Sequence, residues 1–287
     1  MSISIENFIP ISVIDTALQA AFAEDLGGYG DITTMATIDP AQNARAHFVA
    51  RQSGIIAGIE IARRACRYLD SNVNFVPSLS DGKPVEPGQK IATISGNAAA
   101  ILSSERVALN FLCHMSGIAS MTNQFVKKIE GTKAKICCTR KTRPLLRAFE
   151  KYAVRAGGGS NHRFNLSDAV LIKDNHIASF KSIREAVLQT KEKLGHMVRI
   201  EVEVDRIDQI DDVIAGGADA ILLDNMTPDQ LRAAVQRIDG RLEIEASGGV
   251  TLDSVRAIAE TGVDFISVGR ITHSAPWLDI GLDFEAL

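Results

Sequence analysis

The sequence is poor in aromatic residues and cysteines. Phe, Trp and Tyr together make up 5% of the 287 residues, and four residues are cysteine. Cys137 and Cys138 are adjacent and no CxxC pair occurs, which excludes a disulfide framework and disfavours a structural zinc site. This cysteine usage is typical of a protein in a reducing cytoplasm.

The sequence also lacks the features of membrane and nucleic-acid proteins. No window approaches the roughly 18 apolar residues that a bilayer span requires. The N-terminus has no basic segment leading into an apolar run, so no secretory signal is expected. A pI near 5.9 and the scarcity of aromatic residues argue against nucleic acid as the main partner. We therefore expect a cytoplasmic protein that binds neither a membrane nor nucleic acid.

The chain does contain enough apolar sequence for a large core. Apolar residues make up 46% of it and charged residues 23%, which indicates a folded globular protein. A length of 287 residues suits one large or two modest domains.

From Gly117 onward, short apolar runs alternate with helical stretches. The runs predict strands at 134–138, 169–172, 200–204, 220–223, 242–246 and 265–268. This alternation implies parallel strands with helices outside them. Polar residues close nearly every strand, as in a TIM-type barrel with its active site at the C-terminal rim. Only six or seven strands can be counted, so closure is in doubt, and a doubly wound open sheet is the structural alternative.

Positive charge is concentrated in residues 139–177, which contain eight Lys or Arg residues although the whole chain has a net charge of −4. The cations nearest to expected strand ends are Arg140, Lys141, Arg163 and Lys173. Because strand-end loops carry the chemistry of α/β folds, we expect these four to bind a small, strongly anionic ligand.

A helix is expected between these cations, with Pro144 in its first turn. Arg147, Lys151 and Arg155 recur along it at positions i, i+4 and i+8. Such stripes are usually solvated, so we predict that these three form an exposed face and take no part in the site.

Two loops with small residues follow the last two expected strands. They are Ser247-Gly248-Gly249 and Ser267-Val268-Gly269. Small residues let backbone N–H groups approach an anion, so the pair predicts a phosphate site. The alternative is that both loops are tight turns without a ligand.

Acidic residues are also expected at this rim. Glu201 and Glu203 point to the same side of one strand and need partners. One is expected to pair with a lysine, and the other, with Asp224, to hold Mg²⁺ or ribose hydroxyls. His162 suits either acid–base catalysis or hydrogen bonding to an anion, and we favour the second. Cys137 and Cys138 are predicted to be core residues.

The sequence resembles quinolinate phosphoribosyltransferase, also called nicotinate-nucleotide pyrophosphorylase (carboxylating). The matching motifs are EDLGGYGDITT (24–34), ERVALNFL (105–112), SGIAS (116–120), TRKTRP (139–144), EKYAVRAGGGSNHR (150–163), LIKDNHI (171–177), EVEV (201–204), LLDN (222–225), ASGGV (246–250) and TGVDFISVGRITHS (261–274). They span almost the whole chain. The chain departs from the family pattern at Cys138, where Asp is usual, and at residues 142–145, where TTPG is usual.

The resemblance implies an N-terminal α/β sandwich domain at 1–116 and an incomplete TIM-like (β/α) barrel at 117–275, with the tail 276–287 packing on the first domain. It implies transfer of phosphoribosyl from phosphoribosyl pyrophosphate to quinolinate with decarboxylation, in NAD biosynthesis, with Mg²⁺ as the cofactor. It also implies a homodimer, with a higher oligomer left open.

By motif match, the resemblance also assigns residue roles. Lys141, Glu203 and Asp224 would be catalytic, and the last two would hold Mg²⁺, directly or through water. The substrate-binding residues would be Arg106 from the partner subunit, Arg140, His162, Arg163, Lys173, Ser247, Gly248, Gly249, Ser267 and Gly269. The alternative is a phosphate-binding barrel like the ModD proteins, linked to molybdenum transport.

Overall fold

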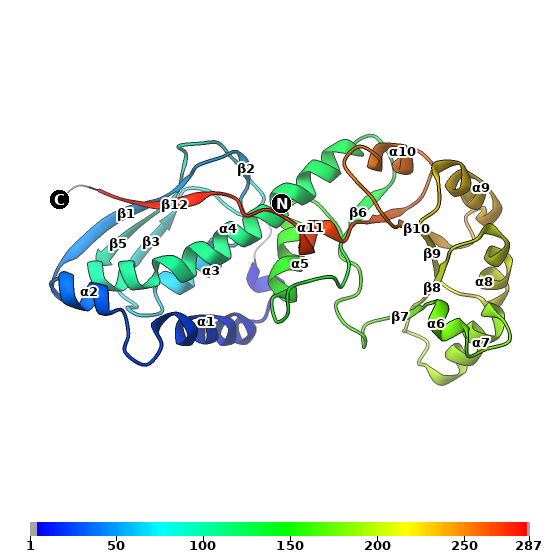
Figure 1. Cartoon of the computed structure of the whole chain (residues 1–287), viewed down its shortest axis with the longest axis horizontal. Coiled ribbons are helices and arrows are strands. Elements are labelled where there is room, and N and C mark those ends of the chain that lie inside the picture. The colour runs from blue at the N-terminus through cyan, green and yellow to red at the C-terminus, as the bar shows by residue number, and fades with distance from the viewer. Residues whose placement is uncertain (1–4, 286–287) are drawn as a thin grey trace. The chain divides into compact units, whose positions relative to one another are not determined.

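The computed structural model describes residues 5–285 and contains two compact units (Figure 1). The first consists of residues up to 123, together with 144–158 and the C-terminal segment from 274, and the second of 124–143 together with 159–273. The boundaries expected from the sequence, 1–116 and 117–275, follow chain order and remain a proposal. Within the described range, no helix combines the length and the apolar character that a membrane span needs.

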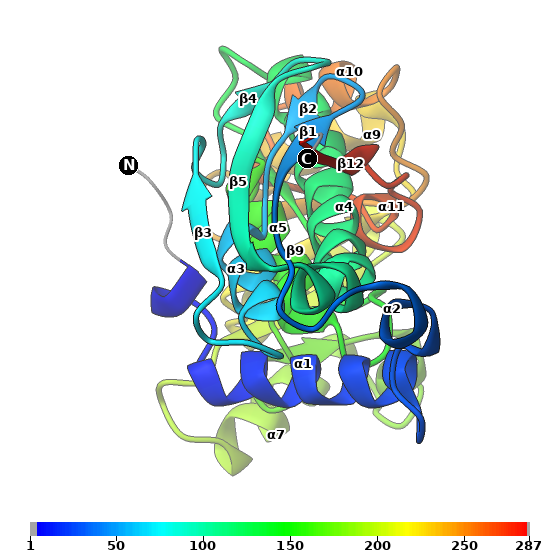
Figure 2. The same ribbon diagram turned by 90° about the vertical axis from the view of Figure 1, so that its left-hand side faces the viewer.

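The first unit is built on an antiparallel sheet with the strand order β12-β1-β5-β3. Helices α3 and α4 lie on one face of this sheet (Figure 2). The elements are η1 (Ile5–Asn7), α1 (Ile11–Leu26), α2 (Ile32–Thr37), β1 (Asn43–Ala50), β2 (Gly54–Ile55), α3 (Ile59–Cys66), β3 (Asn74–Pro77), β4 (Pro84–Val85), β5 (Lys90–Asn97), α4 (Ala98–Lys128), α5 (Arg147–Ala156) and β12 (Ile280–Phe284).

The C-terminal strand β12 completes this sheet from the far end of the sequence. It pairs antiparallel with β1, with Phe48 opposite Leu282. Phe48 is fully buried, so the edge that β12 covers belongs to the core of the first unit. The described part of the segment expected to pack on the N-terminal domain thus supplies a strand to the first unit.

Helix α4 is longer than the sequence suggested. Apolar residues at helical spacing in the sequence predict a helix from Ala98 to Ser116, whereas α4 continues to Lys128. The helix continues through Gly117. Glycine is needed at this position for close packing, because a Cβ atom there would lie 2.0 Å from the carbonyl oxygen of Pro276. Ser116 bonds to Ala57 on its other side, accepting from the backbone N–H at 3.0 Å.

Helix α5 corrects two predictions. It begins at Arg147, so Pro144 precedes the helix instead of occupying its first turn. Lys151, predicted to be solvated, is fully buried beside the fully buried Glu150, while Arg155 is exposed. The side chain of His114 on α4 lies 2.9 Å from Glu150, which shows that α5 turns a charged edge into the unit. Helical spacing alone did not reveal which side would face inward.

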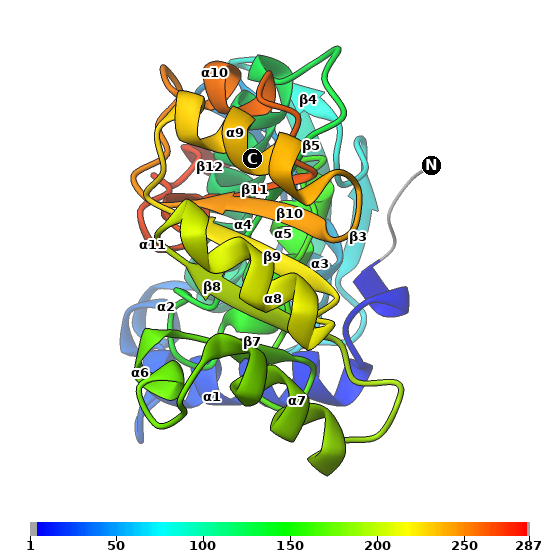
Figure 3. The same cartoon turned by 90° about the vertical axis from the view of Figure 1, so that its right-hand side faces the viewer.

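The second unit contains a six-stranded parallel sheet in the order β6-β11-β10-β9-β8-β7. Helices α7, α8 and α9 lie side by side over one face (Figure 3). The strands are β6 (Lys135–Cys137), β7 (Val170–Ile172), β8 (Ile200–Val204), β9 (Ala220–Asp224), β10 (Glu243–Ser247) and β11 (Phe265–Ser267). The helices are α6 (Asp174–Ile177), α7 (Ile183–Lys193), η2 (Ile207–Gln209), α8 (Ile210–Gly216), α9 (Pro228–Ile238), α10 (Val255–Ala259) and α11 (Arg270–His273).

This arrangement confirms the predicted α/β fold with an incomplete barrel. Strands β6 and β7 are the two edges of the described sheet and do not pair with each other. In β8, the alternate residues Ile200, Val202 and Val204 are buried, so Glu201 and Glu203 share the other face. The sheet therefore presents acids on the face opposite its apolar contacts.

Two helix-to-strand turns, at residues 216–219 and 261–264, are held in the same way. Asp219 accepts a hydrogen bond at 2.7 Å from the backbone N–H of Ile200 on the neighbouring strand. Asp264 accepts one at 2.9 Å from the N–H of Ile244. Each carboxylate fixes the N-terminal end of the adjacent strand. These bonds lie at the end of the sheet opposite the C-terminal strand ends, where the expected site residues lie.

Candidate active site

A cavity of about 400 Å³ lies at the carboxyl ends of the parallel strands in the second unit. Its lining residues are Thr139, Arg140, Lys141, His162, Arg163, Leu171, Lys173, Glu203, Leu222, Asp224, Glu245, Ser247 and Ser267. A second cavity, of about 450 Å³, shares five of these residues and adds Gly248, Gly249, Gly269 and His273. Every residue named from the sequence as a site residue, except Arg106, lines one or both. Arg106 is exposed on α4, in the first unit.

Two arginines dominate the cationic wall. Arg140 is half-buried, and its buried Nε has no hydrogen-bond partner among the described residues. Arg163 donates from one terminal nitrogen to the carbonyl oxygen of Ala169 at 2.8 Å. Burial first, and the nearby charge of Arg140 second, lower the pKa of Arg163 from its usual value. An anion placed between them would satisfy the open donor and relieve the like-charge repulsion.

Lysines extend this positive wall to both sides. The loop of Lys141 is fixed because its carbonyl oxygen accepts a hydrogen bond at 2.7 Å from the hydroxyl of Thr272. Lys173 forms an ion pair with Glu203. The expectation that one strand acid pairs with a lysine is therefore met by Glu203.

Glu203 and Asp224 are the carboxylates that fit a magnesium ion. They come from the neighbouring strands β8 and β9, are half-buried, and line the same cavity. Asp224 accepts a hydrogen bond at 2.7 Å from the side-chain amide of Asn225. Mg²⁺ is usually held by one or two carboxylates with waters and substrate phosphates, so this sparse oxygen set suits it.

The loop after β10 is shaped for close approach of an anion. Gly248 and Gly249 have φ angles of 96° and 58°, in the left-handed region that favours glycine. A Cβ atom on Gly248 would lie 2.1 Å from the side-chain oxygen of Asn225. Asn225, itself at φ 54°, donates its backbone N–H to the carbonyl oxygen of Ser247 at 2.9 Å. The loops after β9 and β10 thus pack together and leave no room for a side chain at position 248.

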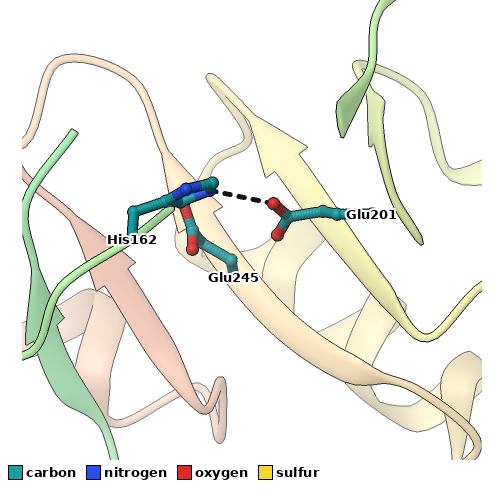
Figure 4. A group of neighbouring side chains, drawn as sticks. All are labelled: His162, Glu201 and Glu245. Atoms are coloured by element: carbon teal, nitrogen blue, oxygen red, sulfur yellow. Dashed lines mark hydrogen bonds and ion pairs between the residues drawn. The ribbon is translucent and has the colours of Figure 1, made fainter. Parts of the chain in front are cut away.

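His162 lies in a cluster with two acids (Figure 4). Its Nε2 is 2.9 Å from Glu201 and 3.9 Å from Glu245. The exposed fraction of Glu245 is 6%. Burial first, and the charge of Glu201 second, raise the pKa of Glu245 to about 7. The second strand acid, Glu201, pairs with this histidine and does not line the cavity, so the acid beside Asp224 is Glu203, the one that also pairs with a lysine.

The sequence did not single out Glu245. It lies in an apolar stretch, and its neighbours Ile244 and Ala246 suggested an ordinary buried strand. The register Glu245–Leu222–Glu203 across three strands places it level with a predicted site acid. The sequence signal that could have revealed Glu245 was an acidic residue inside an otherwise apolar strand, in a sheet whose other strands also carry acids. Cys137 and Cys138 are buried, as predicted.

Comparisons with known proteins agree with this geometry. Residues 118–283 match the C-terminal domain of quinolinate phosphoribosyl transferase, and residues 31–116 match its N-terminal domain. A probable nicotinate-nucleotide pyrophosphorylase [carboxylating] of Bacillus subtilis (strain 168) is 47% identical over 91% of this chain and 90% of its own length. The nicotinate-nucleotide pyrophosphorylase [carboxylating] of Mycobacterium leprae (strain TN) is 42% identical over 93% of this chain and 95% of its own.

Solved structures show the same similarity. The nicotinate-nucleotide pyrophosphorylase from Francisella tularensis has a TM-score of 0.91 at 38% identity, covering 96% of this chain and 98% of that one. NadC from Streptococcus pyogenes has a TM-score of 0.92 at 39% identity, covering 97% and 99%. With both domains matched and relatives more than 40% identical along most of its length, the chain belongs to the quinolinate phosphoribosyltransferase family.

Proposed function

We propose that this chain transfers phosphoribosyl from phosphoribosyl pyrophosphate to the ring nitrogen of quinolinate. The products are nicotinate mononucleotide, pyrophosphate and CO₂, in NAD biosynthesis. The observation that carries the proposal is the Arg140–Arg163 pair: two guanidiniums at one cavity, one with an open buried donor and the other with a lowered pKa. Such a pair suits a ligand with two carboxylates.

Quinolinate would be held by the cationic wall. Arginine can grip a carboxylate through two parallel, charge-assisted hydrogen bonds. Arg140 and Arg163 would take the carboxylates, with Lys173 beside them, and His162 would bound the cavity next to the ring. The ion pair with Glu203 holds Lys173 at the wall of the cavity, where its ammonium can also contact an anionic ligand.

The phosphoribosyl donor would occupy the neighbouring cavity. Backbone N–H groups of Ser247, Gly248, Gly249, Ser267 and Gly269 would surround its 5′-phosphate, because these loops leave little side-chain bulk in the way. Lys141 lines both cavities and can neutralise charge on the departing pyrophosphate. The sugar would lie beside the residues that line both cavities, between phosphate and pyridine.

The chemical step needs negative charge near the sugar. When the bond from C1′ to pyrophosphate breaks, positive charge develops on the ribose, and Glu203 and Asp224 would stabilise it. The ring nitrogen then bonds to C1′ and becomes cationic, which favours loss of the adjacent carboxylate as CO₂. A bound Mg²⁺ would neutralise the diphosphate, and Glu203 and Asp224 would hold it, directly or through water.

We also propose a homodimer in which Arg106 of one subunit completes the site of the other. Arg106 is exposed and belongs to a different unit from the other site residues. The four cysteines are buried thiols, which supports a cytoplasmic location.

The test is an assay of purified protein with quinolinate, phosphoribosyl pyrophosphate and Mg²⁺. The expected result is equal release of pyrophosphate and nicotinate mononucleotide, dependent on both substrates. Pyrophosphate release no higher than in the absence of protein would contradict the proposal and favour the molybdenum-linked phosphate-binding alternative. The names of the relatives do not favour that alternative.

A further inference from the structure

Two acids beneath the cationic wall have no part in the reaction as proposed. Glu201 on β8 and Glu245 on β10 reach the imidazole of His162, and the ligand atoms of all three lie within 4.8 Å of one another. Figure 4 shows Glu201 approaching the ring edge while the Glu245 carboxyl lies behind the ring. The two acids thus contact the histidine from different sides.

The hydrogen bonds around His162 select one tautomer. The backbone N–H of Arg163 donates to Nδ1 at 2.7 Å, so Nδ1 presents a lone pair and carries no proton. The ring proton then lies on Nε2 and is donated to Glu201 at 2.9 Å. Both nitrogens are engaged, and the imidazole is neutral.

Glu245 occupies a separate place in this cluster. Its Oε1 is 3.9 Å from Nε2, beyond hydrogen-bond distance, and has no hydrogen-bond partner among the described residues. The hydrogen bonds at Nδ1 and Nε2 hold the two ring nitrogens. The buried carboxyl of Glu245 fills the space beside the ring and places a second oxygen toward Nε2, which limits tilting of the ring.

We propose that Glu245 is a positioning residue that acts through His162. With Glu201, it holds the imidazole at the cavity wall as a neutral ring with its N–H directed away from the ligand. The positive charge that faces quinolinate then comes from arginine and lysine alone. This inference rests on the proposed function for its kinetic consequence, although the state of the ring can be measured without turnover.

The same three residues could in principle ligate a metal ion. A metal on Nε2 would move the ring proton to Nδ1, where the N–H of Arg163 already points. Two hydrogens would then face each other at a separation that suits only a donor and an acceptor. The geometry therefore favours a proton-bearing histidine over a metal ligand.

Kinetics of Glu245→Ala and Glu245→Gln test the positioning role. Glu245→Ala opens space behind the ring and should raise the KM for quinolinate about tenfold, with the KM for phosphoribosyl pyrophosphate unchanged. Glu245→Gln keeps the volume and should restore the quinolinate KM to within about twofold of wild type. Glu243→Ala, two residues earlier on the same strand and exposed, is the matched control. Equal changes in both KM values, or none, would overturn the proposal.

The tautomer is tested by NMR of protein labelled with ¹⁵N-histidine, independently of activity. The His162 signals are those missing from His162→Gln. Wild type and Glu245→Gln should show a pyridine-like Nδ1 and a pyrrole-like Nε2 at pH 7.5, and Glu245→Ala a mixture. A protonated Nδ1 in the wild type, or Zn²⁺ binding that Glu245→Gln abolishes, would refute the assignment even if the enzyme is active. Lack of turnover together with the expected spectrum would instead contradict the proposed function and leave the positioning role of Glu245 standing.

Discussion

The thiol of Cys138 donates to the side-chain oxygen of Asn161 at 3.2 Å. This contact joins the loop after β6, which carries Arg140, to the segment that carries Arg163. Backbone bonds run beside it, since the N–H of Cys138 donates to the carbonyl oxygen of Ser160 at 3.2 Å. The relative position of the two arginine-bearing segments is therefore set by backbone bonds together with one weak side-chain bond, at a residue where the family usually has Asp.

Replacing Cys138 should loosen the two arginine-bearing segments. Cys138→Ala removes the S–H donor, and we expect the KM for quinolinate to rise about two- to fivefold, as loss of one hydrogen bond permits. Cys138→Ser retains a donor and should stay closer to wild type. Steady-state kinetics with Cys66→Ala as the control, a buried cysteine of the first unit, check this. A selective effect on phosphoribosyl pyrophosphate would contradict it.

Leu145 is strained without compensation. Its φ angle is 66° and its exposed fraction is 97%, so the side chain has little packing to offset a left-handed backbone. Leu145→Gly should raise the free energy of unfolding by about 0.5–1 kcal/mol, the left-handed penalty less the added chain entropy. Leu166→Gly, exposed but outside the left-handed region, should instead lower it by a similar amount. Urea unfolding of both variants distinguishes strain from a general effect of glycine.

Glu245 should make stability depend on pH. Its pKa is about 7 in the folded protein against 4.5 normally, so the folded state keeps a proton that the unfolded state releases. Stability is therefore lost as pH rises from about 4.5 to 7, by up to about 3 kcal/mol, and the loss is constant above.

Glu245→Gln removes this titration. The stability of the variant relative to wild type should rise between pH 5 and pH 8, whereas Glu243→Gln, at the exposed first residue of the same strand, should show no such trend. Unfolding midpoints at four pH values measure it. A difference between Glu245→Gln and wild type that is the same at all pH values would show that Glu245 ionises normally.

Mixing inactive variants tests whether sites are shared. Arg106→Ala and Lys173→Ala proteins should each be inactive alone. After subunit exchange at equal concentrations, half the dimers are mixed and one site in each is intact, so about a quarter of wild-type activity should return. Activity that stays at the level of the separate variants would place Arg106 outside the partner's site.

The elements that the sequence predicted best follow from local rules. Parallel βα units place Arg140, Arg163 and Lys173 at one rim, so strand order was enough to bring them to one cavity. The prediction that Lys151 is exposed was wrong, because helical spacing shows which residues share a face of the helix but not which face packs against another element. Long-range contacts such as Phe48 opposite Leu282, or Glu245 behind His162, join residues that no local pattern connects.

The central claim is that the cationic cavity holds quinolinate through its two carboxylates. Calorimetric titration of quinolinate into wild type, Arg140→Ala and the surface control Arg232→Ala tests it directly. The account predicts that Arg140→Ala weakens binding by about 2–5 kcal/mol while Arg232→Ala leaves it unchanged. Equal quinolinate affinity in wild type and Arg140→Ala would contradict the account.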